Sequence, residues 1–313
     1  MKKIVITGPT GTIGLALIKK CIEENVGVIA ICRRNSEGIK KIPKSPLIKI
    51  IECDLDELNT VELKGNYDTF YHFAWAGTIG DVRNDMYLQN LNIKYTIDAV
   101  NLAHRLGCIT FIGAGSQAEY GRVDGILSPN TPTNPENGYG IAKLCAGKMS
   151  KVLCEKLKIN HIWVRVLSIY GPDDDTNTLV MSTIQKLLNN ELPKFTAGEQ
   201  KWDFLYSEDA ANALFKLGFK TDESKVYCLG SGYAIELKQY IEIIKSIINP
   251  HLKLKYGEIP YNALQVMHLH ADIEQLKIDI NFDATTSFEN GIKSILLKNF
   301  NWNEKVGKSN VRL

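Results

Sequence analysis

The stretch IVITGPTGTIG, Ile4–Gly14, decides the fold of this chain. Its first residues are apolar and β-branched, which predicts a buried strand, and the apolar spacing of Thr12–Glu24 predicts a helix directly after it. Between them the glycines follow a G-x-x-G-x-x-G pattern, which lets the backbone turn tightly and approach a pyrophosphate at the helix N-terminus. A purely structural turn is the alternative, but the strand, the helix and the N-terminal position favour a dinucleotide-binding loop. The residues expected to contact the cofactor here are Gly8, Thr10, Gly11, Thr12, Ile13 and Gly14.

Short apolar runs alternate with amphipathic segments through the first half of the chain. The predicted strands are Lys3–Thr7, Gly27–Cys32, Ile48–Glu52, Thr69–Ala74, Ile109–Ala114 and His161–Leu167. The predicted helices between them are Thr12–Glu24, Met86–Leu106 and Gly138–Leu157. Alternation of strands and helices at this spacing indicates an α/β fold with a doubly wound, parallel sheet of the Rossmann type.

The second half of the chain has a different pattern, which starts after the polar, turn-forming residues 169–178. Its predicted elements are a helix at Leu179–Asn189, an aromatic loop at Phe195–Tyr206, a helix at Ser207–Leu217, a strand at Lys225–Leu229 and helices at Leu237–Ile248, Asp272–Leu276 and Ser287–Leu297. We therefore expect an NADP-binding Rossmann domain over residues 1–170, completed by about 204–232. Residues 171–203 and 233–313 would form a smaller, mixed α/β substrate-binding lobe.

Composition limits the classes of function that this chain can have. Of its 313 residues 44% are hydrophobic and 23% are charged, which is typical of a globular protein. The formal net charge of +2 gives no electrostatic reason to expect a nucleic acid or a membrane as partner. No segment approaches the roughly 20 apolar residues that cross a bilayer. The seven scattered cysteines lack C-x-x-C spacing and are expected to be reduced core residues of a cytoplasmic protein.

The end of the second strand bears on the choice of cofactor. An acidic residue at this point would bind the ribose 2′-hydroxyl of NAD. Here Cys32 stands at that position, and Arg33 and Arg34 follow it, whose guanidinium groups suit the 2′-phosphate of NADP. Ordinary solvated arginines and NAD are the alternative, but the missing acid favours NADP. After the third strand, Asp54 and Leu55 are expected to contact the adenine, with a surface turn as the competing interpretation.

A serine, a tyrosine and a lysine form the candidate catalytic group. Tyr139 and Lys143 are four residues apart in a predicted helix and therefore share one face. A neighbouring ammonium lowers the pKa of a phenol from about 10, so that Tyr139 could exchange a proton with a substrate oxygen. The Y-x-x-x-K spacing alone is a weak signal. Ser116 follows a predicted strand about 20 residues earlier, at the end where ligands bind in open α/β sheets, which makes the signal much stronger.

Together these motifs resemble the extended short-chain dehydrogenases/reductases, in particular their nucleotide-sugar epimerases, dehydratases and reductases. The resemblance covers most of the chain. The matching segments are TGPTGTIG at 7–14, YHFAWAG at 71–77, NLNIKYTIDAVNLA at 90–103, GSQAEYG at 115–121, YGIAK at 139–143, VRVLSIYGP at 164–172 and GEQKWDFLYSEDAANAL at 198–214.

The resemblance implies roles for these residues. Ser116 would hydrogen-bond the substrate oxygen, Tyr139 would donate or accept the proton, and Lys143 would lower the tyrosine pKa and hold the nicotinamide ribose. The resemblance also implies a homodimer that packs through the two long helices. The further cofactor contacts that it implies are Phe73, Ala74, Trp75, Asn92, Tyr139, Lys143 and Leu167.

Two departures from the family pattern reduce the number of reactions that the chain is expected to catalyse. The 4,6-dehydratases carry an Asp–Glu pair directly after the serine or threonine, whereas this chain has Gln117 and Ala118. Alanine cannot act as a base, so dehydration is disfavoured. Glu119 comes one residue later and, on a continuing extended segment, would point to the other face.

The expected substrate site also differs from the family pattern. Ser168 stands where many relatives have asparagine, and Trp202 where many have an arginine that meets the phosphates. Lys201 could take over that charge, and Gln117 is expected near the sugar. His268 and His270 lack further ligands nearby, so no metal is expected.

These features favour NADPH-dependent reduction of a nucleotide-linked 4-keto-6-deoxy sugar, in which the nicotinamide supplies the hydride. An epimerase that recycles NAD is the alternative. A non-catalytic NADP-sensing regulator is disfavoured because the chain keeps the serine, the tyrosine and the lysine.

Overall fold

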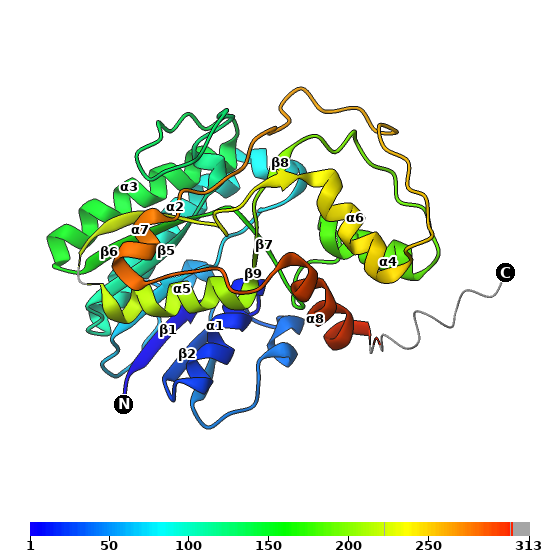
Figure 1. Ribbon diagram of the computed structural model, residues 1–313. Helices are drawn as coiled ribbons and strands as arrows, with labels where there is room; N and C mark the ends of the chain where they lie inside the picture. The colour runs from blue at the N-terminus through cyan, green and yellow to red at the C-terminus, as the bar shows by residue number, and fades with distance from the viewer. Residues whose placement is uncertain (222, 301, 303–313) are drawn as a thin grey trace.

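A computed structural model describes residues 1–221, 223–300 and 302 (Figure 1). Seven parallel strands form its central sheet in the order β10-β6-β5-β4-β1-β2-β3. They are β1 Lys3–Thr7, β2 Gly27–Cys32, β3 Ile48–Glu52, β4 Thr69–His72, β5 Thr110–Ser116, β6 Asn160–Val166 and β10 Lys225–Leu229. The predicted doubly wound parallel sheet is confirmed, and β5 extends two residues beyond its predicted end, to Ser116.

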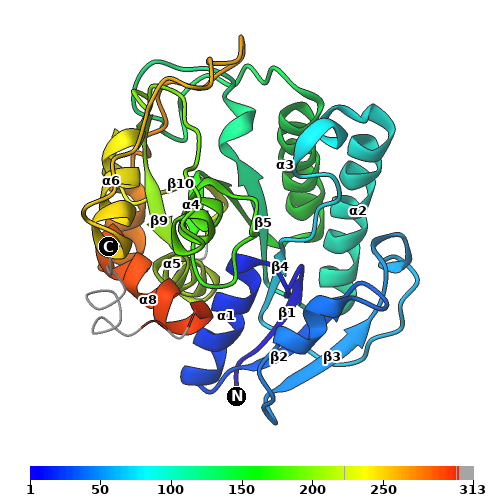
Figure 2. The same ribbon diagram turned by 90° about the vertical axis from the view of Figure 1, so that its right-hand side faces the viewer.

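Helices cover both faces of this sheet (Figure 2). They are α1 Thr12–Glu23 and α5 Ser207–Lys220 on one face, and α2 Met86–Arg105 and α3 Gly138–Leu157 on the other. Alternate side chains of β1 pack on opposite faces of the sheet. Ile4 and Ile6 pack in the core with α1 and α5, whereas Val5 packs with α2. Burial on both faces explains why the strands are continuously apolar rather than alternating.

A third apolar cluster is separate from the two that pack against the sheet. It gathers side chains from α4 Leu179–Leu188, α6 Leu237–Ile248 and α8 Phe288–Phe300, which lie together beyond one end of the sheet in Figure 1. In α6, Tyr240, Ile241, Ile244 and Ile248 are buried, which is the spacing of an amphipathic helix face. The short helix α7 spans Glu274–Ile280 and packs against α5 instead. The division of the chain into two domains stays a prediction.

Four short strands form two small sheets outside the central one, and the sequence did not predict them. β7 Ser168–Tyr170 pairs in parallel with β9 Phe204–Tyr206, and β8 Lys201–Trp202 pairs antiparallel with β11 Ile235–Glu236. The predicted aromatic loop at Phe195–Tyr206 therefore contains two strands. Strands of two or three residues are too short to show a period-two pattern, so the sequence carried no signal for them.

The path of the chain creates a crevice at one edge of the sheet. From β1 the chain runs outward to β2 and β3 and then crosses back to β4 on the other side of β1. The loops that follow β1 and β4 therefore diverge at the carboxyl ends of two neighbouring strands. In open α/β sheets this switch point is where ligands bind.

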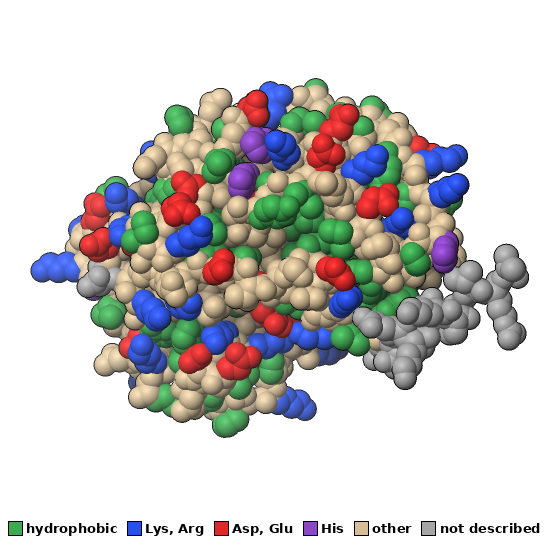
Figure 3. All heavy atoms as spheres, viewed as in Figure 1, with side chains coloured by type: hydrophobic (Ala, Val, Ile, Leu, Met, Phe, Trp, Pro, Cys, Tyr) green, Lys and Arg blue, Asp and Glu red, His purple; other side chains and the backbone are tan. Residues whose placement is uncertain are grey.

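One face of the surface shows the charge balance that the composition implies. In Figure 3, lysine and arginine side chains are interspersed with aspartate and glutamate, so this face has no region of a single sign. None of the helices in the described part of the chain is long and apolar enough to cross a membrane.

Candidate active site

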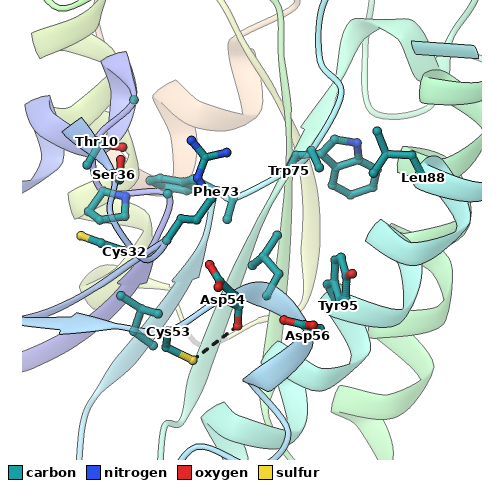
Figure 4. A pocket seen from close by; sticks show the side chains of 18 residues that line it. Thr10, Cys32, Ser36, Cys53, Asp54, Asp56, Phe73, Trp75, Leu88 and Tyr95 are labelled. Atoms are coloured by element: carbon teal, nitrogen blue, oxygen red, sulfur yellow. Dashed lines mark hydrogen bonds between the residues drawn. The ribbon is translucent and has the colours of Figure 1, made fainter. Parts of the chain in front are cut away.

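A cleft of about 640 Å³ lies at the switch point, at the carboxyl ends of β1, β2 and β4 (Figure 4). Nine residues predicted to bind the cofactor line it: Gly8, Thr10, Gly11, Arg33, Asp54, Leu55, Phe73, Ala74 and Trp75. The sequence reasoning missed other parts of its wall, among them Ser36, Asp56 and Tyr95. Ser36 and Asp56 belong to no segment singled out in the sequence, and Tyr95 lies in the segment 90–103 without having been assigned a role; only the folded chain brings them to the cleft.

The floor of the cleft requires glycine. Gly8 has a φ of 71°, and a Cβ at this position would lie 2.6 Å from the backbone nitrogen of Ala74. Beneath it, a Cβ on Gly14 would collide with the carbonyl oxygen of Gly8. The backbone can therefore approach a ligand closely at the N-terminus of α1, where N–H groups lack helical partners. This cradle fits the pyrophosphate of a dinucleotide.

The remaining predicted cofactor residues support the cleft from behind its surface. Thr12 lies in the first turn of α1 and donates a hydrogen bond to the carbonyl of Asp173 at 3.3 Å. Asn92 on α2 accepts from the backbone N–H of Ala76 and donates to its carbonyl, both at 2.9 Å, and so fixes the loop after β4. Ile13 and Leu167 pack in or against the core.

The two arginines after β2 lie in different environments. Arg33 lines the cleft. Arg34 binds the carboxylate of Glu57, with Nη2 2.7 Å from Oε1, and its Nε lies 3.7 Å from Asp54. Glu57 ends the short 3₁₀ helix Leu55–Glu57 after β3. Of the two guanidinium groups, only that of Arg33 is therefore free of an ion pair and directed to the cofactor cleft in the described chain.

The three predicted catalytic residues come together at the end of β5. Ser116 is the last residue of β5, and Tyr139 is the second residue of α3, where the Ser116 side chain lowers the pKa of the Tyr139 hydroxyl. The Nζ of Lys143, one turn further along α3, donates to the carbonyl of Ala114 at 2.6 Å. The same Nζ lies 3.7 Å from the ring centroid of Trp75, which also lines the cofactor cleft. The catalytic group and the cofactor cleft therefore share a wall.

Burial sets the protonation of this group. It raises the pKa of Tyr139, whereas the hydrogen bond to Ser116 and the charge of Arg83 lower that pKa. Burial also lowers the pKa of Lys143 to about 7, against the attraction of Glu119. In this structure the cation that lowers the tyrosine pKa is therefore Arg83, a residue that the sequence did not single out, rather than Lys143.

Glu119 does not have the orientation expected from the sequence. The chain turns after Ser116 into the 3₁₀ helix Gln117–Glu119, so the prediction of a continuing extended segment is wrong. The Glu119 side chain is completely buried and points back, where Oε1 accepts from the Ser116 N–H at 2.8 Å. The same carboxylate accepts from Trp163 Nε1 at 2.9 Å and Arg165 Nε at 2.8 Å. All of these contacts hold the carboxylate in place inside the core.

The predicted substrate residues fall into two cavities. Gln117 lines a cavity of about 150 Å³ that also contains Arg83 and Arg122. Ser168 and Trp202 line a pocket of about 350 Å³ near the start of α4, and the Trp202 indole N–H donates to the Ser168 hydroxyl at 2.9 Å.

Lys201 lies outside both substrate cavities. It is exposed and lines neither of them, because neighbouring side chains of a strand point to opposite faces. It therefore does not replace the missing arginine in the Trp202 pocket.

The two neighbouring histidines bind protein groups. Nε2 of His270 is 3.1 Å from the carbonyl of Gly232, and Nδ1 of His268 is 3.4 Å from Asp124. Within the described chain, no three His, Cys, Asp or Glu side chains are grouped so as to hold a metal ion.

Comparison with known proteins agrees with this fold. Residues 4–230 match the model of the NAD dependent epimerase/dehydratase family. CDP-abequose synthase from Salmonella muenchen is 27% identical over 94% of this chain and 97% of its own. The dTDP-6-deoxy-L-talose 4-dehydrogenase (NAD(+)) from Aggregatibacter actinomycetemcomitans is 27% identical over 84% of this chain and 97% of its own.

Among solved structures, a UDP-N-acetylglucosamine 4-epimerase from Methanobrevibacter ruminantium, in complex with UDP-N-acetylmuramic acid, has the same fold. The TM-score is 0.84, with 22% identity over 94% of this chain and 98% of that chain. The chain belongs to the NAD dependent epimerase/dehydratase family of nucleotide-sugar-modifying enzymes.

The depressed pKa of Lys143 predicts a pH dependence of stability. Between about pH 7 and 10.5 the unfolded chain keeps the lysine proton while the folded protein has lost it, so this group makes stability rise with pH. Across this window the free energy of unfolding of the wild type should therefore rise, relative to that of Lys143→Met, by on the order of a few kcal/mol. Urea denaturation of the ligand-free proteins measures this difference.

Lys148→Met is the matched control, since Lys148 is exposed on the same helix. Its stability should keep a constant offset from the wild type over the same pH range. A constant offset for Lys143→Met as well would show that the buried ammonium keeps its ordinary pKa.

Proposed function

We propose that this protein is a cytoplasmic reductase that uses NADPH to reduce the 4-keto group of a nucleotide-linked 6-deoxy sugar. One observation carries the proposal. A serine, a tyrosine and a lysine meet beside the dinucleotide cleft, while the carboxylate after the serine, Glu119, is buried and bound to three donors. The site therefore offers proton transfer to an oxygen but no adjacent base for removing a carbon-bound proton. The cysteines are all free, which suits a reducing compartment.

Each residue of the site has a separate role in the proposed reaction. A nicotinamide cofactor bound in the cleft would supply the hydride for the carbonyl carbon. Ser116 holds the carbonyl oxygen, and the Tyr139 hydroxyl donates its proton to that oxygen, which leaves the tyrosinate. Lys143, in contact with Trp75 at the edge of the cleft, would hold the ribose of the cofactor. The substrate would contact Gln117, which directly follows Ser116 and lines the smaller cavity, and Trp202, which lines the larger pocket.

An epimerase that oxidises and then reduces the same sugar is the second candidate. The folds of solved 4-epimerases favour it, and one similar relative carries NAD(+) in its name. The same catalytic group serves both reactions, so consumption of the cofactor distinguishes them. A cofactor-binding regulator would not need Ser116 and Tyr139 together at the end of β5.

A turnover assay tests the reductase directly. We expect NADPH to be oxidised in proportion to product with one or more nucleotide-linked 4-keto-6-deoxy sugars, because Tyr139 is placed to protonate the carbonyl oxygen. Tyr139→Phe should lower kcat by about 100-fold or more, the usual contribution of a positioned acid. Epimerisation of a nucleotide hexose without net cofactor oxidation would establish the alternative instead.

The different environments of the two arginines predict their effects on the cofactor. Arg33→Ala should raise the KM for NADPH by about tenfold or more and leave that for NADH unchanged, because one charge-assisted contact to the 2′-phosphate is lost. Arg34→Ala should change both constants much less, since Arg34 is bound to Glu57. Equal effects of Arg33→Ala on both cofactors would contradict a contact between Arg33 and the 2′-phosphate.

We also propose that the protein forms a homodimer through the face shared by α2 and α3, which lie side by side in Figure 2. The exposed apolar side chains there are Met86, Tyr87, Leu91, Ile141, Met149 and Val152. Burial of such a face against a second copy removes it from water. Sedimentation should give twice the chain mass of 35.1 kDa, and a mass of one chain would contradict the dimer.

A further inference from the structure

An arginine outside the predicted catalytic group lies against the catalytic tyrosine. Arg83 belongs to the short 3₁₀ helix Gly80–Asn84 between β4 and α2. The central carbon of its guanidinium group is 4.6 Å from the ring centroid of Tyr139. At this distance a cation is attracted to an aromatic face, and more strongly to a ring that carries the negative charge of a phenolate.

Hydrogen bonds hold the segment that carries Arg83. The buried Gln89 on α2 donates to the carbonyls of Gly77 and Val82, at 2.9 and 3.1 Å. The Asn84 side chain accepts from the backbone N–H of Gly138, at the first residue of α3. Arg83 is thus anchored between the two long helices, next to the turn that presents Tyr139.

The charge of Arg83 is not compensated within the described chain. No acidic side chain there forms an ion pair with it, although it lines a cavity that contains Glu136. Glu136 is instead bound by both Nε and Nη2 of Arg122, the other arginine of that cavity. A guanidinium group keeps its charge at every pH at which the protein is folded.

Three charged groups face Tyr139, one from each element packed around it. They are Arg83 from the Gly80–Asn84 segment, Glu119 from the turn after β5 and Lys143 from α3 itself. The Nζ of Lys143 is 5.7 Å from the tyrosine ring centroid, further away than the guanidinium carbon, and it donates to Ala114. Glu119 opposes tyrosinate formation, so Arg83 is the permanent charge that favours it.

We propose that Arg83 is a positioning residue that acts through Tyr139, by stabilising the tyrosinate left when the proton moves to the substrate oxygen. The inference rests on the proton-donor role that the proposed function gives to Tyr139. In the reduction, the O–H bond of Tyr139 breaks, the proton joins the substrate oxygen, and solvent later returns a proton to the tyrosinate. Arg83 stays charged throughout and exchanges no proton.

Titration of Tyr139 tests the proposal without any substrate. The ultraviolet absorbance of tyrosinate is followed against pH in ligand-free protein, and the same titration with Tyr139→Phe in each background is subtracted, since the chain has 13 tyrosines. The Arg83→Met variant should shift the Tyr139 midpoint to higher pH. The Arg83→Lys variant keeps the charge and should restore the midpoint. Arg122→Met, which removes the paired arginine of the same cavity, should leave the midpoint in place.

Kinetics give the second readout. In the alcohol-oxidation direction Tyr139 must be ionised, so Arg83→Met should move the acidic limb of the kcat profile to higher pH. Near neutral pH the loss in kcat should be about tenfold, with recovery as the pH rises and with rescue by Arg83→Lys. A loss of packing alone would lower kcat equally at all pH values.

The outcomes separate this inference from the proposed function. An unchanged Tyr139 midpoint in Arg83→Met overturns the role of Arg83, whatever the reaction is. A shifted Tyr139 midpoint together with no turnover on keto sugars supports the role of Arg83 and contradicts the proposed reductase activity. Arg83→Gln is the second neutral variant, to be used if Arg83→Met does not fold, and the same shift is expected of it.

Discussion

The packing of Trp163 against glycine positions sets the distance between the sheet and α3, and the catalytic group depends on that distance. The indole lies where a Cβ on Gly113 or Gly115 of β5 would collide with it, and a Cβ on Gly147 of α3 would lie 2.6 Å from it. Gly147, Lys143 and Tyr139 are spaced by four residues and share one face of α3. The close approach at Gly147 therefore brings the lysine and the tyrosine to the end of β5. A larger residue at Gly147 would push this face of the helix away from Ser116.

Glu119 connects this packing to the serine. Its carboxylate accepts from the same indole and from the Ser116 N–H, and its charge is balanced by Arg165 from β6. A buried ion pair is costly to break because the partner is left without compensation. The carboxylate thus serves as a fixed support for the turn that presents Ser116. This use of Glu119 agrees with Gln117 and Ala118 at the dehydratase positions, since none of the three residues is placed as a base.

Local patterns in the sequence were sufficient to predict the sheet. β1, β2, β3, β10 and α3 have their predicted bounds, because each follows from runs of apolar residues or from helical spacing within the segment itself. The glycine loop and the serine–tyrosine–lysine group could be singled out because the chemistry proposed for them requires particular residue types at fixed spacing. The family resemblance also predicted roles for the segments between the glycine loop and the tyrosine–lysine helix.

The features that the sequence did not predict depend on contacts between distant segments. Arg34 lies next to Arg33 in sequence, but it forms an ion pair with Glu57, which follows β3. Because of this ion pair the two arginines have different environments, and Arg33 lines the cleft. Glu119 was misplaced because the turn after Ser116 is stabilised by Arg165 and Trp163 on another strand. Arg83 belongs to no motif and meets Tyr139 only when α2 and α3 pack together.

The charges around Tyr139 bear on the direction of the reaction. Burial raises its pKa, so the resting side chain is protonated and ready to donate, which is the state that reduction of a ketone requires. An enzyme that begins by oxidising an alcohol needs the ionised tyrosine at the start instead. Burial keeps the tyrosine protonated at rest, and the neighbouring guanidinium charge stabilises the tyrosinate that forms when the proton is transferred. This combination is the one that the proposed reductase requires of Tyr139, which would give up its proton once in each turnover.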